Sequence, residues 1–297
     1  MRSKILAPMP HSSPLPSPRS PPAHSWHCGR FRIDVSRPRI MGVVNVTPDS
    51  FSDGGRFFDP QRAIAQAQRL IEEGADLVDV GGESTRPGAK EVDAPEELRR
   101  VLPVLRALRD AAVPVAIDTV KPQVMQVAIA EGVAIINDVS ALRAAGALQA
   151  VAGRDVGVCL MHMQGEPRSM QEAPAYANVV EEVRRFLTER IDAATGAGMA
   201  RERIVIDPGF GFGKTVEHNL ELLRGLGRFA ELGVPLLVGL SRKSLLGAIT
   251  GRPAADRLAP SIAAALLAAQ HGAKILRVHD VRETRDALAV WQALRNA

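Results

Sequence analysis

Residues 40–82 read IMGVVNVTPDSFSDGGRFFDPQRAIAQAQRLIEEGADLVDVGG, and in them two apolar runs flank a helical pattern. The runs at 40–46 and 77–82 are almost continuously hydrophobic, as in strands that are buried on both faces. Between them, Asp59 is a suitable helix N-cap with Pro60 in the first helical turn, and Gly74 ends the pattern. This stretch predicts a strand–helix–strand unit with parallel strands.

The same alternation continues along the chain, with Ala/Leu/Glu/Arg-rich helical stretches between apolar runs. Eight β–α units in roughly 260 residues fit a (β/α)8 TIM barrel, which typically takes about 250. A doubly wound sheet is the alternative, but it rarely needs eight parallel strands, and no Gly-rich dinucleotide fingerprint follows the first run. We therefore predict a single-domain α/β barrel. The six further runs are 114–119, 134–139, 157–163, 204–207, 236–240 and 274–278.

The first 37 residues differ in composition from the rest. Residues 1–30 hold seven prolines, many serines and no acidic residue, which is typical of a disordered segment. We predict a disordered N-terminal extension over 1–37, with 1–30 dispensable, and a barrel domain over 38–297. This extension carries a net charge of +5 against +4 for the whole chain, which leaves the rest of the chain at −1, so no basic face of the barrel indicates a nucleic-acid partner.

Composition excludes several classes of protein. The two cysteines, Cys28 and Cys159, are too few and too far apart for a disulfide framework or a zinc site, and a reducing cytoplasmic location fits them. Cys159 lies in an apolar run and is expected in the core. No apolar stretch reaches the ~20 residues of a membrane helix, and no apolar segment near the N-terminus suggests a secretory signal.

Polar residues gather where the predicted strands end, and in a barrel these ends form the active-site rim. Two carboxylates and an amide suit the donor and acceptor edges of a flat heterocycle, whereas Arg and His suit a diphosphate. Single members of such a set are often helix caps, and we interpret Asp138 and Asp280 in that way. The carboxylates and amide are Asp118, Asp207 and Asn137; the candidates for a diphosphate or Mg²⁺ are Asn45, Thr85, Arg86, Arg277 and His279.

The glycine-rich stretch GFGFGKT at 209–215 resembles a P-loop but lacks its spacing, because position 208 is proline. It also lacks the spacing of a dinucleotide fingerprint, since position 214 is lysine. We expect these glycines to let the backbone pass close to a ligand.

Eight separated motifs resemble those of the dihydropteroate synthase family over residues 38–297. They are MGVVNVTPDSFSDGG (41–55), GGESTRPGA (81–89), AIDT (116–119), IINDV (135–139), LMHMQG (160–165), DPGFGFGK (207–214), SRKS (241–244) and RVHDV (277–281). AIDT more often begins Ser-Val in this family, and the proline-rich extension is additional.

The resemblance implies a transferase that joins a pterinylmethyl diphosphate to 4-aminobenzoate in folate synthesis, with Mg²⁺, as a homodimer, and with sulfonamides as competitors. It implies four catalytic residues, namely Asp118, Lys243, Arg277 and His279. The remaining roles also follow from the resemblance: Asp118, Asn137, Asp207, Lys243, Met161 and Gly239 around the pterin; Thr85, Arg86, Asn45, Arg277 and His279 at the diphosphate, with Asn45 near the metal; and Pro87, Phe212, Lys243 and Ser244 around 4-aminobenzoate.

The implied mechanism is SN1-like, with loss of diphosphate before the arylamine attacks, and it requires no general base. The loops at 47–59 and 83–95 are long and are expected to close over the site. The helix at 261–271 is a candidate dimer surface, although core packing explains its composition equally well.

Two rival functions remain open. A non-catalytic paralogue would bind pterin without turnover, and the presence of Asn45, Arg86, Lys243, Arg277 and His279 speaks against it. A pterin-binding methyltransferase domain would share the barrel but is not expected to contain the SRKS and RVHD segments.

Overall fold

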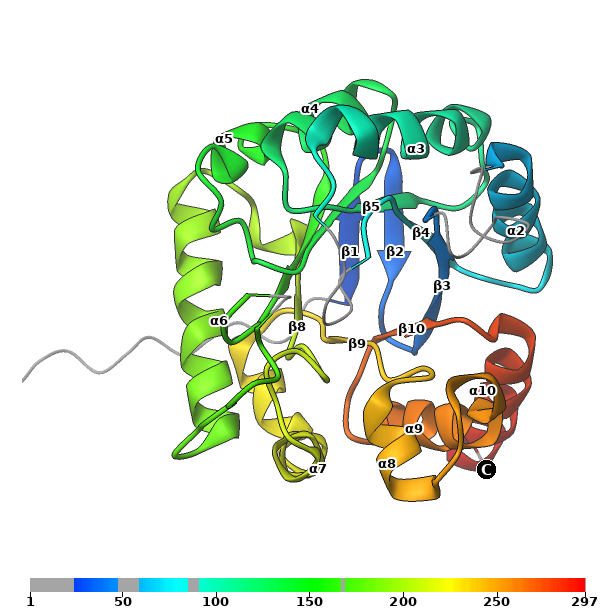
Figure 1. Ribbon diagram of the computed structural model, residues 1–297, viewed down its shortest axis with the longest axis vertical. Coiled ribbons are helices and arrows are strands. Elements are labelled where there is room, and N and C mark those ends of the chain that lie inside the picture. Colours follow the sequence, from blue (N-terminus) through cyan, green and yellow to red (C-terminus); the bar gives the residue numbers. More distant parts are fainter. Residues whose placement is uncertain (1–23, 48–58, 85–90, 167–168, 297) are drawn as a thin grey trace, which may run out of the picture.

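The computed structural model describes residues 24–47, 59–84, 91–166 and 169–296, and eight parallel strands lie at the centre of this part of the chain. Helices surround the strands (Figure 1). Each strand falls on one of the eight predicted runs, so the repeat pattern is confirmed. The strands are β3 (Arg39–Asn45), β4 (Leu77–Gly81), β5 (Val115–Asp118), β6 (Ile135–Asp138), β7 (Gly157–Met161), β8 (Ile204–Asp207), β9 (Leu237–Val238) and β10 (Ile275–Val278).

The sheet closes on itself. Hydrogen bonds join the strands in the order β8-β7-β6-β5-β4-β3-β10-β9. A parallel bridge between Ile206 and Leu236 connects the two ends, and Ile206 N donates to Pro235 O at 3.1 Å. The predicted TIM barrel is therefore confirmed, and the open doubly wound sheet is excluded.

The crossover helices begin and end where local chemistry predicts. Asp59 caps α2 by accepting from Gln61 N at 2.9 Å, and Gly74 follows the helix with φ of 96°. Of the helices described, none is long and apolar enough to span a lipid bilayer. The α-helices are α2 (Pro60–Glu72), α3 (Ala94–Ala107), α4 (Pro122–Ala130), α5 (Ala147–Val151), α6 (Val179–Gly196), α7 (Val216–Arg224), α8 (Ser244–Thr250), α9 (Leu258–Gln270) and α10 (Val281–Asn296).

The barrel has an apolar layer inside its N-terminal half. One side chain from each of the eight strands contributes to a buried cluster that also contains residues from the N-terminal segment. Because side chains on a strand alternate between inside and outside, the next inward position lies two residues further on. In strand order from β3 to β10, the apolar layer consists of Met41, Leu77, Ala116, Ile135, Cys159, Val205, Leu237 and Ile275.

An N-terminal hairpin packs against this inner layer. Strands β1 (Ser25–Cys28) and β2 (Phe31–Asp34) pair antiparallel, and Trp26 and Cys28 are fully buried. Trp26 Nε1 donates to Arg203 O at 2.9 Å. The prediction of disorder over 1–37 is therefore wrong for residues 24–37, because the prolines of the segment all precede residue 24 and the side chains of Trp26 and Cys28 are buried against the barrel. Residues 1–23 lie outside the described residues.

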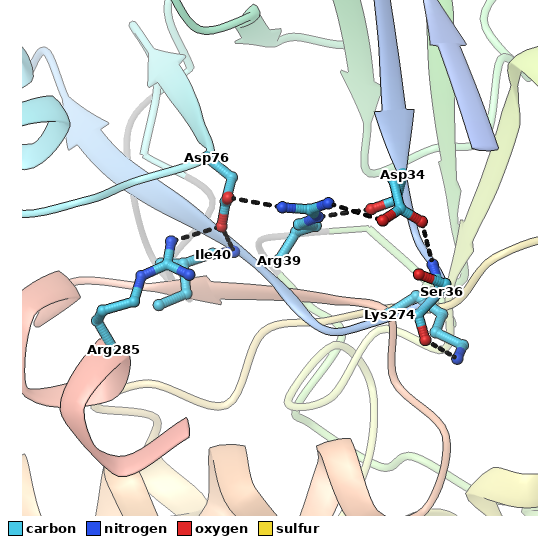
Figure 2. A network of polar contacts seen from close by, with 7 residues as sticks. All are labelled: Asp34, Ser36, Arg39, Ile40, Asp76, Lys274 and Arg285. Carbon is cyan, nitrogen blue, oxygen red and sulfur yellow. Dashed lines mark hydrogen bonds and ion pairs between the residues drawn. The ribbon is translucent and has the colours of Figure 1, made fainter. Parts of the chain in front are cut away.

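A polar network ties the hairpin to the barrel (Figure 2). The Arg39 guanidinium contacts Asp34 Oδ2 at 3.2 Å and Asp76 Oδ1 at 3.3 Å. Asp76 Oδ2 in turn accepts from Ile40 N at 2.8 Å and from Arg285 Nη2 at 2.6 Å. The network thus links the end of the hairpin to the starts of β3 and β4 and to α10. It lies at the N-terminal end of the barrel, where residues contribute to stability and not to catalysis.

We expect a chain that begins at residue 38 to be less stable than one that begins at residue 24, by more than about 3 kcal/mol in the free energy of unfolding. Removing the hairpin uncovers the inner layer and removes the buried indole of Trp26, and loss of a buried Trp alone typically costs about 3–5 kcal/mol. Urea denaturation of both chains measures the difference. Equal denaturation midpoints would show that the hairpin contributes nothing to stability.

Candidate active site

The C-terminal rim of the barrel collects the predicted site residues. On each strand, the position two residues beyond the apolar layer is the next one that points into the barrel. In six of the strands this position holds a predicted site residue. Lys243, Ser244, His279 and Phe212 follow in the connecting segments, whereas Thr85, Arg86 and Pro87 lie outside the described residues. The six inward residues are Asp118, Asn137, Met161, Asp207, Gly239 and Arg277.

Arg277 on β10 lies between two carboxylates. Its Nε donates to Asp79 Oδ2 at 2.7 Å, and its Nη2 donates to Asp118 Oδ2 at 3.0 Å. Asp79 is fully buried, and Arg277 and Asp118 are 21% and 14% exposed. Three charged side chains from β4, β5 and β10 therefore form one group inside the rim.

Asp79 is a site residue that the sequence interpretation missed. Its carboxylate also accepts from Asn137 Nδ2 at 2.9 Å, so it joins the pterin candidate Asn137 to the diphosphate candidate Arg277. The signal was present in the sequence: Asp79 is a charged residue inside a strand that is otherwise apolar. It lies two residues after Leu77, so it occupies an inward position.

The buried location of the site shifts the pKa values of its charged groups. Burial raises the pKa of Asp118 to about 7, with a further increase from Asp79 that Arg277 opposes. Burial also raises the pKa of Asp207, against the lowering effect of Lys243. The pKa of Lys243 is lowered to about 8 by burial, although Asp207 raises it. Asp118 and Lys243 consequently titrate near neutral pH, where both are able to change charge during a reaction.

Lys243 contacts the segment that follows β8. Its Nζ donates to Phe210 O and lies 4.3 Å from the centre of the Phe212 ring. Phe212 packs against a small apolar cluster that also contains Met161. These contacts place an ammonium group beside an apolar, partly aromatic surface, which suits an aromatic ligand with a polar edge.

The glycines after β8 are explained by contacts within the protein. Gly209 and Gly213 have φ of 70° and 62°. A Cβ on Gly209 would lie 1.8 Å from His162 O, and one on Gly213 would lie 2.4 Å from Gln164 O. The sequence interpretation assigned these glycines to the approach of a ligand. Instead they let this segment pass against the backbone that follows β7.

Buried Lys214 holds that segment in place. Its Nζ contacts His162 Nδ1 at 3.0 Å and donates to Gly209 O at 2.9 Å and to Phe212 O at 3.0 Å. Burial and the adjacent ammonium group lower the pKa of His162 to about 2, so its ring is neutral and accepts through Nδ1. Three acceptors match the three N–H donors of a lysine, although burial lowers the pKa of Lys214.

Replacement of Lys214 by methionine is expected to lower the free energy of unfolding by at least about 3 kcal/mol. The change leaves His162 Nδ1 and two carbonyl oxygens without a donor, and each unsatisfied buried group typically costs about 1–3 kcal/mol. Urea denaturation measures the effect, with Glu221→Gln on the exposed side of α7 as the control. A Lys214→Met chain as stable as the control would refute this role.

The segments after β9 and β10 hold each other in position. Ser241 Oγ accepts from His279 N at 3.2 Å and lies 3.0 Å from His279 Nδ1. The Arg242 guanidinium pairs with Asp280, with its Nε 3.1 Å from Oδ2. Arg257 Nη1 donates to the carbonyl oxygens of Arg242 and Lys243 at 3.0 and 3.2 Å. These contacts fix the positions of Lys243 and His279 at the rim.

The two aspartates left out of the predicted site have structural partners. The Asp138 carboxylate accepts from Ser140 N at 2.7 Å and from Leu142 N at 2.8 Å, so it stabilises the turn after β6. The predicted helix cap is wrong here, because the next helix, α5, begins at Ala147 with Gly146 at its N-cap. Asp280 accepts from Thr284 N through its backbone, while its carboxylate pairs with Arg242. Asp280 thus does more than the predicted cap, because it joins two rim segments.

A second charged group lies beside the site, between β4 and β5. Lys121 Nζ donates to Glu97 Oε2 at 2.6 Å and also binds Glu83 Oε2. Glu97 is fully buried, and its Oε1 has no hydrogen-bond partner among the described residues. Glu83 Oε1 accepts from Val92 N at 2.9 Å. This group therefore holds the two ends of the segment between β4 and α3.

Comparison with known proteins finds relatives over most of the chain. Residues 41–279 match the family model for pterin binding enzymes. The dihydropteroate synthase of Neisseria meningitidis serogroup C is 52% identical over 276 residues, which cover 91% of this chain and 98% of the relative.

Solved structures agree in fold as well as in sequence. Dihydropteroate synthase of Xanthomonas albilineans with 4-aminobenzoic acid has a TM-score of 0.87 and 55% identity, and the match covers 92% of this chain and 99% of that chain. The enzyme of Yersinia pestis in a sulfonamide drug complex has a TM-score of 0.88 and 45% identity, with 92% of this chain and 100% of that chain covered.

Proposed function

Because the chain belongs to the dihydropteroate synthase family of pterin-binding enzymes, we propose that it condenses (7,8-dihydropterin-6-yl)methyl diphosphate with 4-aminobenzoate to give 7,8-dihydropteroate and diphosphate. The observation that carries the proposal is the rim group of Asp118, Asn137 and Arg277. It combines hydrogen-bonding groups for a heterocycle with a buried cation for a leaving anion. The enzyme is thus a transferase of folate synthesis.

The reaction is SN1-like. The bond from the methylene carbon to the diphosphate oxygen breaks first, and its electron pair leaves with diphosphate. The positive charges of Arg277 and Lys243 stabilise this leaving group, and the Asp118 carboxylate stabilises the cation that remains on the pterin. The amine nitrogen of 4-aminobenzoate then forms the new C–N bond and loses a proton to water. An arylamine is neutral at pH 7, so its attack requires positioning rather than a general base.

The ring of Phe212, next to Lys243, suits the ring of 4-aminobenzoate, while Met161 in the adjacent apolar cluster is assigned to the pterin. Ser244 at the start of α8 lies on the same rim segment. Sulfonamides resemble this substrate in shape, so we propose that they compete for the same surface, in line with the drug complex of the Yersinia pestis relative.

Magnesium is proposed as the cofactor, with Asn45 at the end of β3 as its protein ligand. The part of the chain that the structure describes contains no group of three His, Cys, Asp or Glu side chains suited to a metal ion. A site with one amide oxygen fits Mg²⁺, which often takes few protein ligands because substrate phosphates supply the others. Mg²⁺ would neutralise charge on the departing diphosphate.

We further propose a homodimer, formed by α8, α9 and α10. These helices expose Ile249, Leu267, Val290 and Leu294, with exposed fractions of 54%, 46%, 65% and 76%. Much of the predicted surface at 261–271 is instead core, since Ala264, Ala265, Ala268 and Ala269 are buried. A cytoplasmic location is proposed from the substrates and from two cysteines, both free and buried.

The experiment that tests the function measures dihydropteroate formation by purified protein with pterin diphosphate, 4-aminobenzoate and Mg²⁺. Product that depends on all three additions supports the proposal. Folded protein that binds pterin but forms no product would identify a non-catalytic paralogue, and the catalytic roles would then be withdrawn.

A further inference from the structure

Asp79 lies too deep in the barrel to belong to the substrate surface. It pairs in register with Ala116 of β5, whereas Gly81 pairs with Asp118. In the strand direction, Asp79 thus lies two residues before the position that neighbours Asp118. Its side chain is fully buried. Any effect of Asp79 on a substrate must therefore pass through the side chains that it contacts.

One oxygen of Asp79 serves two residues of the site. Oδ2 accepts from Arg277 Nε at 2.7 Å and from Asn137 Nδ2 at 2.9 Å. An ionised carboxylate only accepts hydrogen bonds, so the Asn137 amide must turn its nitrogen toward Asp79 and its oxygen away. The same carboxylate fixes the Nε side of the guanidinium, while Asp118 takes Nη2 at 3.0 Å. Asp79 thereby fixes the orientation of the Asn137 and Arg277 side chains.

The charge of Asp79 has a separate effect, on Asp118. The two carboxylates share Arg277, and Asp79 contributes to the raised pKa of Asp118 after burial, the main cause. Removing the negative charge of residue 79 removes one cause of the increase and leaves Arg277 to serve Asp118 alone. The pKa of Asp118 should therefore fall, and activity that requires ionised Asp118 should persist to lower pH.

We propose that Asp79 is the positioning residue of this site: it orients the Asn137 amide toward the pterin and holds the Arg277 guanidinium toward the diphosphate. The proposal rests on the proposed function. It assigns Asp79 no contact with substrate, and it explains why a charged residue occupies a barrel position that is apolar or glycine elsewhere in the same strand, at Leu77 and Gly81.

Two substitutions separate the hydrogen bonds of Asp79 from its charge. In Asp79→Asn the amide oxygen still accepts from Arg277 and Asn137, but the charge is absent. In Asp79→Ala both are absent. Asp110→Asn, at an exposed position after α3, is the matched control. Binding of 6-hydroxymethylpterin is measured by fluorescence, inhibition by inorganic diphosphate is measured in the turnover assay, and thermal unfolding is followed in parallel.

For Asp79→Ala we expect pterin affinity and diphosphate inhibition to weaken by about 10- to 100-fold, the scale of an unsatisfied buried donor. For Asp79→Asn we expect pterin affinity within about 3-fold of the wild type and an acid limb of kcat/KM displaced to lower pH. Wild-type ligand binding by Asp79→Ala, with a change in thermal unfolding only, would overturn the proposal, as would an unchanged acid limb in Asp79→Asn.

A double-mutant cycle tests the route through Asn137. If Asp79 acts on pterin through this amide, Asp79→Ala should have little further effect on pterin affinity in an Asn137→Ala background. Additive losses would contradict the proposal. Because pterin binding is measured without turnover, this cycle still tests Asp79 if the wild-type protein forms no dihydropteroate, the result that would remove the proposed function.

Discussion

Replacement of Arg277 by alanine is expected to lower kcat/KM for dihydropteroate formation by about 10²- to 10³-fold. Removing one preorganised group that stabilises developing charge typically has an effect of this size. The loss here has two parts. The departing diphosphate loses a cation, and the Asp79 and Asp118 carboxylates face each other without the guanidinium between them.

Loss of the guanidinium between Asp79 and Asp118 leads to a further prediction, on the pH dependence of the variant. Arg277 lowers the pKa of Asp118, which burial raises to about 7, so without Arg277 that pKa should rise. Asp118 would then be protonated at neutral pH, and residual activity should increase with pH up to a higher value than in the wild type. Arg277→Lys should recover part of the rate, because it restores charge but not the two-sided geometry.

The control is Arg154→Ala, an exposed arginine before β7 at the opposite end of the barrel. It should leave kcat/KM unchanged. Initial rates at saturating Mg²⁺, with circular dichroism of both variants, complete the comparison. A folded Arg277→Ala enzyme within about 3-fold of wild-type kcat/KM would remove Arg277 from the diphosphate site.

Replacement of Lys121 by methionine is expected to lower the free energy of unfolding by about 3–5 kcal/mol. Breaking a buried ion pair on one side leaves an uncompensated charge, and measured costs lie in this range. Here that charge is the carboxylate of Glu97, which is fully buried and has one oxygen without a partner in the described part of the chain. Glu83 is 21% exposed, so solvent compensates it better.

The double variant Lys121→Met, Glu97→Gln should be more stable than Lys121→Met alone, because the buried charge is then absent. Arg106→Met supplies the comparison with an exposed pair: Arg106 is 61% exposed and binds Glu131, and its loss should cost less than about 1 kcal/mol. Urea denaturation at pH 7 measures all three. A loss below 1 kcal/mol in Lys121→Met would mean that Glu97 is not charged in the folded protein.

The strands and the rim could be predicted because both depend on local patterns. A strand buried on both faces is a short apolar run, and eight of them determine the barrel. Counting by twos along each run then reaches Asp118, Asn137, Asp207 and Arg277. The same count from Leu77 reaches Asp79, so that residue was within reach of the sequence. Residues 77–82 were interpreted as an apolar strand, and the buried charge of Asp79 within them was therefore overlooked.

Other features depend on contacts between distant segments. Trp26 is held in place because the carbonyl oxygen of Arg203, 177 residues later, accepts its hydrogen bond, and because the apolar layer of the barrel packs against its ring. Nothing in the Pro/Ser-rich composition near it predicts either. The pairing of Lys214 with His162 is similar: the glycines that surround Lys214 suggested a ligand, while its partner His162 lies in the segment after β7.

The buried position of Trp26 also has a consequence for the order in which the chain folds during synthesis. Trp26 leaves the ribosome early, yet its acceptor at Arg203 and its neighbour Gly157 are made far later. The hairpin therefore waits for most of the barrel before it can dock, and domains with such distant contacts fold slowly. The first tryptophan of the chain to be synthesised is buried only after β7 and β8 exist, so its fluorescence should report a late step of folding.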